Sequence, residues 1–261
     1  MGQALIQGIL RGGLLTPDRI WAATRTSASA QAVESTLGVP VTTRYEDRLP
    51  NTAIVLLCVK PAHVPSAIGR LAQSGLPPGT LLISIAAGVS TARLEQLLGV
   101  PNPWIRAMPN TPSIVGEGMT VICGGKHATP AHLEQAQSLF AVVGRCRQVD
   151  EQHFNAITAL SGSGPAYVYL IIEAMADAGV RVGLPRQLAL DLVAQTVGGA
   201  ARMVQATGRH PAALRDDVTT PAGCTIAGLL MLEDGKIRSV LARAIEEAAQ
   251  IARGLGETRK D

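Results

Sequence analysis

A chain of 261 residues suits one large domain or two of ordinary size, and with two Trp, three Tyr and two Phe its core must be aliphatic. The net charge of +3 is small and contains no run of like charges, so nucleic-acid binding is not expected. No apolar segment is long enough to span a bilayer, so no membrane partner is expected. No segment resembles a signal peptide, and the four cysteines are far apart. We therefore expect a cytoplasmic protein with reduced thiols.

The first half alternates between helical periodicity and short apolar runs. Helices are predicted at residues 4–14, 30–37 and 64–73, and strands or short apolar runs at 19–24, 39–43, 52–59, 81–86, 104–108 and 119–123. The longer runs are continuously apolar, which is typical of parallel strands covered on both faces. We therefore predict an α/β domain with a doubly wound parallel sheet over residues 1–150. Cys58 and Cys123 lie in these runs and are expected to be small core residues.

The second half, residues 151–261, is predicted to be all helical, with long helices at 165–180, 185–206 and 237–255. The first of these is apolar on nearly every side, with Glu173 and Asp177 as its main polar stripe. Such a helix must be buried almost all round, and a region of this size does not easily surround it. We infer a subunit interface between two copies, with a monomer whose sheet domain covers the helix as the alternative.

The opening stretch MGQALIQGIL looks like the back half of a nucleotide-binding loop. A dinucleotide fingerprint is G-x-G-x-x-G between a strand and a helix, and only its last glycine is present, as Gly2. In that reading Gly2 permits close packing, and the helix from Gln3 directs its free N–H groups at a pyrophosphate. A single glycine before a helix is common, so an ordinary N-terminal helix remains open.

A second candidate segment is Thr24-Arg25-Thr26-Ser27, which follows the short run at residues 19–24. An NAD site places Asp or Glu near this point, whereas an NADP site tolerates arginine for the 2′-phosphate. Here there is no acid, and a guanidinium with hydroxyl donors suits a phosphate. A solvated polar loop is the competing interpretation.

Two glycine-containing segments precede helices in the second half, Ser161-Gly162-Ser163-Gly164-Pro165 and residues 217–225. Each puts hydroxyls and free N–H groups at a helix start, which indicates a carboxylate-binding pocket, although helix capping alone explains part of the pattern. The five histidines have no metal-ligand spacing, and there is no nucleophile elbow or carboxylate pair. The chemistry is therefore expected to come from a cofactor, with no metal.

Five motifs together resemble one family, the pyrroline-5-carboxylate reductases. They are VLLCVKP (55–61), ISIAAGVS (83–90), RAMPNTP (106–112), LSGSGPAY (160–167) and LRDDVTTPAGCTIAGL (214–229). The resemblance implies a Rossmann-type domain followed by a helical dimerisation domain, with higher assembly of dimers. It also implies reduction of the small cyclic imine 1-pyrroline-5-carboxylate to L-proline by NADPH or NADH, the last step of proline biosynthesis.

The resemblance also implies roles for individual residues. Thr225 offers its hydroxyl to the ring nitrogen and is the expected catalytic residue. The expected substrate-binding residues are Ser161, Gly162, Ser163, Thr220, Gly223, Cys224 and Thr225. The expected cofactor-binding residues are Gly2, Gln3, Arg25, Val59, Lys60, Pro61, Ala86, Ala87, Pro109 and Asn110. Arg25 lies where a 2′-phosphate is expected, so NADPH (NADP in its oxidised form) is preferred over NADH.

The chain departs from the family pattern at three places. The segment Ala222-Gly223-Cys224-Thr225 stands where the family usually has Gly-Gly-Thr-Thr. The position near Tyr45 often carries an asparagine that contacts the adenosine ribose. The family also begins with a strand of about 5–6 residues and a full glycine loop, which this sequence lacks. Without that strand, neighbouring strands are left unpaired and the pyrophosphate is poorly held.

Two alternatives remain, one of them another reductase and the other a protein of a different class. A reductase related to 3-hydroxyacid dehydrogenases has a similar two-domain build but is expected to use a lysine of the helical domain as proton donor. The lysine deep in the second half, Lys236, lies in a turn-like EDGK, which counts against it. A non-catalytic, dimer-forming paralogue is the other alternative, because the front strand is missing.

Overall fold

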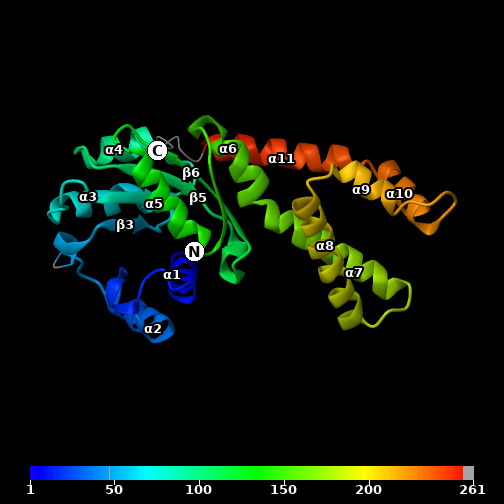
Figure 1. The fold of residues 1–261 in the computed structure, drawn as a ribbon, viewed down its shortest axis with the longest axis horizontal. Helices are drawn as coiled ribbons and strands as arrows, with labels where there is room; N and C mark the ends of the chain where they lie inside the picture. The colour runs from blue at the N-terminus through cyan, green and yellow to red at the C-terminus, as the bar shows by residue number, and fades with distance from the viewer. Residues whose placement is uncertain (47, 255–261) are drawn as a thin grey trace. The chain divides into compact units, whose positions relative to one another are not determined.

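The computed structural model describes residues 1–46 and 48–254, which form two compact units (Figure 1). The first unit contains Met1–Ser163 and the end of the last helix from Ala248, and the second contains Gly164–Glu247. The domain boundary predicted at residue 150 stays a prediction. Residue 255, the predicted end of the last helix, lies outside the described residues.

The main sheet of the first unit has five strands in the order β3-β4-β5-β6-β7. Their bounds are Ile54–Leu57, Leu81–Ser84, Trp104–Met108, Gly118–Gly124 and Gly144–Gln148. All neighbours are parallel except β5 and β6, which are antiparallel. The predicted parallel sheet is thus confirmed for the pairs β3–β4, β4–β5 and β6–β7, and the β5–β6 pair departs from it. A short 3-10 turn at Thr111–Val115 joins β5 to β6, whereas a parallel pair needs a crossover of a dozen or more residues.

Helices pack against both faces of this sheet, which confirms the doubly wound class. On one face Leu81 and Ile83 pack with α1 (Gly2–Arg11) and α5 (Pro130–Ala141). The alternate residue Leu82 packs on the other face with α3 (Val64–Gln73) and α4 (Thr91–Leu98). Successive strand residues point to opposite faces, so a strand covered on both sides is apolar throughout. Figure 1 shows α3, α4 and α5 beside the strands.

A separate two-stranded parallel sheet pairs β1 (Ala22–Ala23) with β2 (Val41–Thr42), and α2 (Ser27–Leu37) connects them. Among the described residues β1 pairs with β2 alone and β3 with β4 alone, so each has one unpaired edge. The Trp21 indole N–H, just before β1, donates to Thr52 Oγ1, just before β3, at 3.1 Å. This hydrogen bond connects the two sheets at one end, although no strand of one sheet pairs with a strand of the other.

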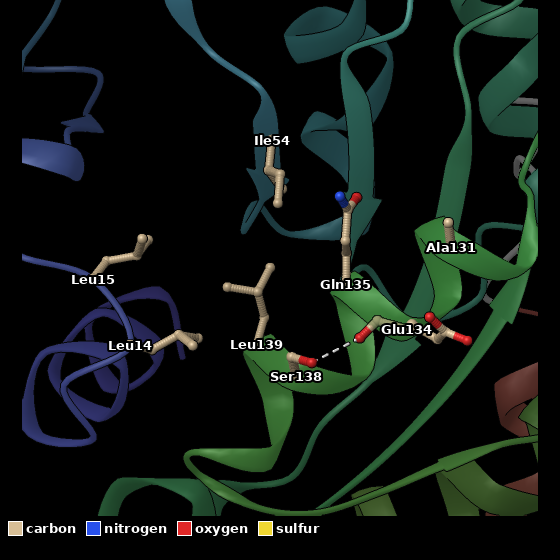
Figure 2. Close-up of a pocket in the computed structure, with 8 residues that line it drawn as sticks. All are labelled: Leu14, Leu15, Ile54, Ala131, Glu134, Gln135, Ser138 and Leu139. Carbon is tan, nitrogen blue, oxygen red and sulfur yellow. Dashed lines mark hydrogen bonds between the residues drawn. The ribbon is translucent and has the colours of Figure 1, made fainter.

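Strand β3 has a composition that suits a central strand, although it lies at an edge. Its residues Ile54, Val55 and Leu56 are only half-buried, whereas every residue of β4 is buried. A cavity of about 490 Å³ borders this strand. Figure 2 shows its lining residues, Leu14, Leu15, Ile54, Ala131, Glu134, Gln135, Ser138 and Leu139. Among the described residues, this edge of the sheet is therefore open and apolar.

The chain leaves the sheet through α6 (Phe154–Ile157) and a π-helical turn at Thr158–Gly162. Five helices follow: α7 (Gly164–Arg181), α8 (Arg186–Thr207), α9 (Pro211–Asp217), α10 (Cys224–Asp234) and α11 (Ile237–Gly254). Helices α7 and α8 approach closely at Gly179, where a Cβ atom would lie 3.1 Å from Ala189 Cβ. The prediction of a helical second half is confirmed for residues 151–254.

Many apolar side chains of the helical unit are exposed. In α7 the sole buried residue is Ala176, while Tyr169 and Leu170 are 58% and 65% exposed; in α10, Met231 is 71% exposed. A single chain therefore leaves apolar helix surface in water, as the predicted subunit interface requires. Within the described residues we find no helix with both the length and the hydropathy to span a membrane.

The cysteines divide into core and surface positions. Cys123 and Cys146 are buried, and burial raises the pKa of their thiols to about 12 and about 11. Cys58 is not a strand residue, because β3 ends at Leu57 and Cys58 lies in the following loop with part of its surface exposed. The surrounding protein still desolvates its thiol and raises the pKa to about 11.

Candidate functional site at the carboxyl ends of the strands

Three strand ends carry most of the predicted cofactor-binding residues. Strands β3, β4 and β5 are parallel, and Leu57 lies opposite Ser84, which lies opposite Arg106. The segments that follow therefore leave the sheet at one edge. They contain the predicted residues Val59, Lys60, Pro61, Ala86, Ala87, Pro109 and Asn110. In open α/β sheets ligands bind outside this edge.

The start of α1 lies beside the same edge. A Cβ atom at Gly2 would be 3.2 Å from Cys58 Cβ, immediately after β3, so glycine allows this close approach. The helix begins at Gly2, and the first N–H groups of a helix have no partner within it. Gly2 and Gln3 are thus positioned with the strand-end residues, and their N–H groups suit an anion.

Arg25 follows β1 and is exposed. Its neighbour Thr26 caps α2, because its Oγ1 accepts from the Ser29 N–H at 3.3 Å. The hydroxyl of Thr24 donates to the Thr26 carbonyl at 3.1 Å. Helix capping thus accounts for Thr26, and the exposed guanidinium of Arg25 is left as the phosphate-binding candidate.

The structure brings one predicted cofactor residue together with a predicted substrate residue. Asn110 Nδ2 donates to the Ser161 carbonyl at 3.1 Å, and it lies 3.5 Å from Ser161 Oγ. On its other side Asn110 Oδ1 accepts from the Met119 N–H at 2.9 Å. The end of β5 is therefore bonded directly to the loop expected to bind substrate.

The segment Ser161-Gly162 does not begin a helix in the ordinary capped way. It lies within the π-helical turn, where the Ser163 N–H donates to the Thr158 carbonyl at 2.9 Å, five residues back. Gly162 lies against the end of the Met108 side chain, where a Cβ atom would be 2.7 Å from Met108 Cε, so a larger residue would displace that flexible side chain. Isolated π-turns occur frequently at functional sites.

Thr220, Gly223, Cys224 and Thr225 belong to the helical unit and form a group of their own. The Gly223 N–H donates to the Thr220 carbonyl at 3.1 Å, and a side chain at Gly223 would clash with Thr220 Oγ1. Helix α10 begins at Cys224, so the N–H groups of Cys224 and Thr225 lie in its first turn without helical partners. A carboxylate is a suitable ligand for such groups.

Ala222, one of the departures from the family pattern, lies in this loop with φ at +54°. That is the left-handed region, which glycine enters at little cost. The backbone therefore retains the turn that the family's glycine favours, with an alanine in it.

One polar cluster beside the carboxyl end of β5 was not predicted from the sequence. Glu151 Oε1 accepts from Arg106 Nη1 at 3.0 Å and from the Thr91 N–H at 2.8 Å, and its Oε2 accepts from the Thr91 hydroxyl at 2.6 Å. The Arg106 guanidinium lies 4.4 Å from the centre of the Phe154 ring. The available signal was Arg106 itself, a charged residue in the otherwise apolar strand WIRAM.

Opposing effects act on the carboxyl group of Glu151. Partial burial alone raises its pKa, but the hydrogen bonds from Thr91 and Arg106 outweigh burial and lower the pKa below the ordinary value. Glu151 is thus held as a carboxylate. Among residues 1–46 and 48–254 no group of His, Cys, Asp and Glu side chains has an arrangement that could hold a metal.

Two family models match different parts of the chain. Residues 1–88 match the model described as NADP oxidoreductase, coenzyme F420-dependent, and residues 151–255 match pyrroline-5-carboxylate reductase dimerisation. With the doubly wound sheet and its strand-end site, these matches define an NADP-binding oxidoreductase that self-associates through a helical domain.

Full-length relatives identify the particular family. The chain is 42% identical to pyrroline-5-carboxylate reductase of Arabidopsis thaliana, over 99% of this chain and 93% of the relative. It is 40% identical to that of Methanosarcina acetivorans, over 98% and 95% of the two chains. The chain belongs to the pyrroline-5-carboxylate reductase family, which consists of oxidoreductases.

Solved structures agree with this assignment over nearly the whole length. A pyrroline-5-carboxylate reductase from Coxiella burnetii matches with a TM-score of 0.90 at 34% identity, covering 98% of this chain and 95% of that chain. The enzyme from Plasmodium falciparum, whose structure has NADP bound, matches with a TM-score of 0.87 at 30% identity and the same coverage.

Proposed function

We propose that this chain reduces 1-pyrroline-5-carboxylate to L-proline with NAD(P)H, the last step of proline biosynthesis. The observation that carries the proposal is the 42% identity to a pyrroline-5-carboxylate reductase over 258 residues, which includes both glycine-containing loops of the helical half. The reaction needs one binding group for a dinucleotide and one for a carboxylate. The carboxyl ends of β3, β4 and β5 supply the first, and the start of α10 supplies the second.

The residues at the sheet edge fit a dinucleotide. Ala86 is buried and small, Ala87 beside it is half-buried, and Gly2 lies so close to Cys58 that a larger side chain would crowd the approach. Backbone N–H groups without helical partners at the start of α1 suit a pyrophosphate, and Arg25 suits a 2′-phosphate. When bound here, reduced nicotinamide supplies the hydride.

In the helical unit, the loop Thr220–Thr225 is proposed to hold the substrate carboxylate by its backbone N–H groups. In the sheet unit, Ser161, Gly162 and Ser163 are proposed as substrate-binding residues. The iminium carbon already carries positive character, so the reaction needs no strong general acid. Hydride addition turns the C=N bond into a single bond and returns a lone pair to nitrogen. The half-buried hydroxyl of Thr225 is proposed to hydrogen-bond this nitrogen.

The test is turnover of the purified chain and of Thr225→Ala. We expect NADPH oxidation with formation of L-proline, and a fall in kcat of about ten- to hundredfold in the variant, as for loss of one hydrogen bond to a charged group. Thr196→Ala, which removes a helix hydroxyl bonded to its own backbone at Leu192, is the control and should retain full turnover. NADPH binding without proline formation would contradict the proposed reaction, and no NADPH binding would favour a non-catalytic paralogue.

NADPH is proposed as the preferred cofactor because the segment after β1 offers Arg25 and no acidic residue. The same assay gives kcat/KM for NADPH and for NADH. A higher value with NADH would contradict the preference and would leave the proposed reaction untouched.

A two-fold dimer is the proposed basic assembly, with association of dimers into larger species. The exposed apolar side chains of α7 and α10 support it, and sedimentation analysis of the purified protein measures it. The cytoplasm is the proposed location, because the four cysteines are free and free thiols suit a reducing compartment.

A further inference from the structure

Residues of one face of β5 contact the segment that leads into the helical half. Arg106, Met108 and Asn110 are two residues apart, so in extended chain they point to the same side. Arg106 contacts Glu151 and Phe154, Met108 lies against Gly162, and Asn110 bonds Ser161. Strand β5 and its extension therefore hold residues 151–162 at three successive points.

Of these three residues, Asn110 lies nearest the candidate site, and both the oxygen and the nitrogen of its carboxamide are hydrogen-bonded. Its oxygen accepts from Met119 of β6 at 2.9 Å, and its nitrogen donates to the Ser161 carbonyl at 3.1 Å. Rotating the amide by half a turn would set oxygen against a carbonyl and NH₂ against an N–H, so the two partners fix its orientation. The carboxamide is thus engaged within the protein.

The turn that Asn110 holds lies against the end of β5. Ser161 and Gly162 are the last residues of the π-helical turn, and a Cβ atom at Gly162 would be 2.7 Å from the end of the flexible Met108 side chain. Loss of the bond from Asn110 would leave the Ser161 carbonyl without this side-chain donor. The position of Ser161–Ser163 is therefore expected to depend on the Asn110 side chain.

We propose that Asn110 is a positioning residue that holds Ser161–Ser163 at the carboxyl end of β5. In this position the loop presents substrate to the cofactor bound at the carboxyl ends of β3, β4 and β5. The proposal rests on the proposed function, in which that loop binds the imine acid. It also changes the expected role of Asn110, because the side chain acts through Ser161 rather than by gripping the cofactor.

The experiment compares Asn110→Asp with Asn102→Asp. The Asn110 variant keeps the acceptor for Met119 and places an oxygen opposite the Ser161 carbonyl. Asn102 is the matched control: it is a buried amide before the other end of β5, and its Nδ2 donates to the carbonyls of Pro77 and Thr80 at 3.0 and 3.1 Å. Both variants lose donors to carbonyl groups, so general destabilisation affects both.

For Asn110→Asp we expect KM for 1-pyrroline-5-carboxylate to rise about tenfold, as for loss of one hydrogen bond, with Kd for NADPH within about twofold of the wild type. Asn102→Asp should leave both constants within about twofold. An equal rise in Kd for NADPH would overturn the proposal in favour of direct cofactor contact, and an unchanged KM would overturn it outright.

Hydrogen exchange gives a readout that does not depend on turnover. Backbone amides in residues 158–163 should exchange at least about tenfold faster in Asn110→Asp than in the wild type, and at the wild-type rate in Asn102→Asp. Asn110→Ala tests the same point without adding a charge. Unchanged exchange in both Asn110 variants would overturn the proposal. If the wild type makes no proline, the proposed function fails, while exchange still decides whether Asn110 holds the loop.

Discussion

At the scale of the residue, Ala222 occupies a backbone conformation suited to glycine. Its φ of +54° brings Cβ close to the following carbonyl, which costs an L-residue about 1–2 kcal/mol. The next residue, Gly223, is also restricted, because a side chain at that position would clash with Thr220 Oγ1. The turn is therefore fixed by the loop, and strain is concentrated at one position.

We predict that Ala222→Gly raises the free energy of unfolding by about 1 kcal/mol, which raises Tm by about 3 °C in a chain of this size. Ala200→Gly, in the interior of α8, is the control of opposite sign and should lower stability by about 1 kcal/mol, because glycine is disfavoured in helices. Thermal unfolding of both variants measures the effect. A fall in Tm for both would show that the Ala222 turn is not strained.

The ion pair between the carboxylate of Glu151 and the buried guanidinium of Arg106 makes stability depend on pH. The folded-state pKa of Glu151 is lowered, so its contribution to stability is present above the unfolded-state pKa of about 4.3 and is lost as pH falls through the lower folded-state value. The same carboxylate compensates the charge of Arg106, whose side chain is 6% exposed.

We predict that Glu151→Gln lowers the free energy of unfolding at neutral pH by about 2 kcal/mol, the usual effect of losing hydrogen bonds to a charged group. The difference from the wild type should shrink as pH falls below the folded-state pKa of Glu151, because the wild-type carboxyl is then neutral too. Urea titrations at neutral and acidic pH give both values. Glu134→Gln, on an exposed face of α5, should change stability little at either pH. A pH-independent difference would argue against the carboxylate as the cause.

At the scale of the element, the buried parallel strands were the most predictable from the sequence. Runs 81–86 and 104–108 contain β4 and β5 because strands covered on both faces must be apolar throughout. Strand β7, with the sequence GRCRQ, was not predicted because its residues 145, 147 and 148 are exposed and polar. Apolar periodicity finds the centre of a sheet and misses a polar edge.

Helices α4 and α5 were not predicted although their ends carry sequence signals. Ser90 Oγ accepts from the Arg93 N–H at 3.2 Å, and Gly99 ends α4 in the left-handed conformation. Thr129 and His132 form a capping box at the start of α5. Strand direction was the other failure, since apolar content does not record whether β6 returns parallel or antiparallel to β5.

The candidate site was predictable to the extent that it follows from the strand ends. Parallel strands end at one edge, so motifs after β3, β4 and β5 come together by topology alone. The bond between Asn110 and Ser161 could not be read from the sequence, because 51 residues separate them and a carboxamide has no specific partner in a sequence pattern. The same is true of the Arg106–Glu151 pair, which depends on long-range packing.

At the scale of the whole molecule, β1 and β3 each have one edge whose backbone groups form no hydrogen bonds to another strand of the described residues. Leu14 and Leu15 are 40% and 37% exposed beside Ile54, in the cavity shown in Figure 2. A core cluster nevertheless includes Val39 before β2 and Leu81 and Ile83 of β4, so one apolar core joins the two sheets. A strand between β1 and β3 would pair both edges and cover the half-buried side chains of β3.

We predict that a short N-terminal extension, an apolar strand of about six residues followed by Gly-x-Gly-x before Met1, raises Tm by at least about 5 °C and tightens NADPH binding. The strand supplies ladder hydrogen bonds to β1 and β3, and the added glycines complete the loop in front of α1. The matched control keeps the glycines and replaces the apolar residues by Ser, Asp and Asn, so that it adds length without a buried strand. Calorimetry and NADPH titration compare the three proteins. Equal Tm and equal affinity for both extended forms would mean that the gap between the sheets does not accept a strand, and the two edges would then have to be satisfied in another way.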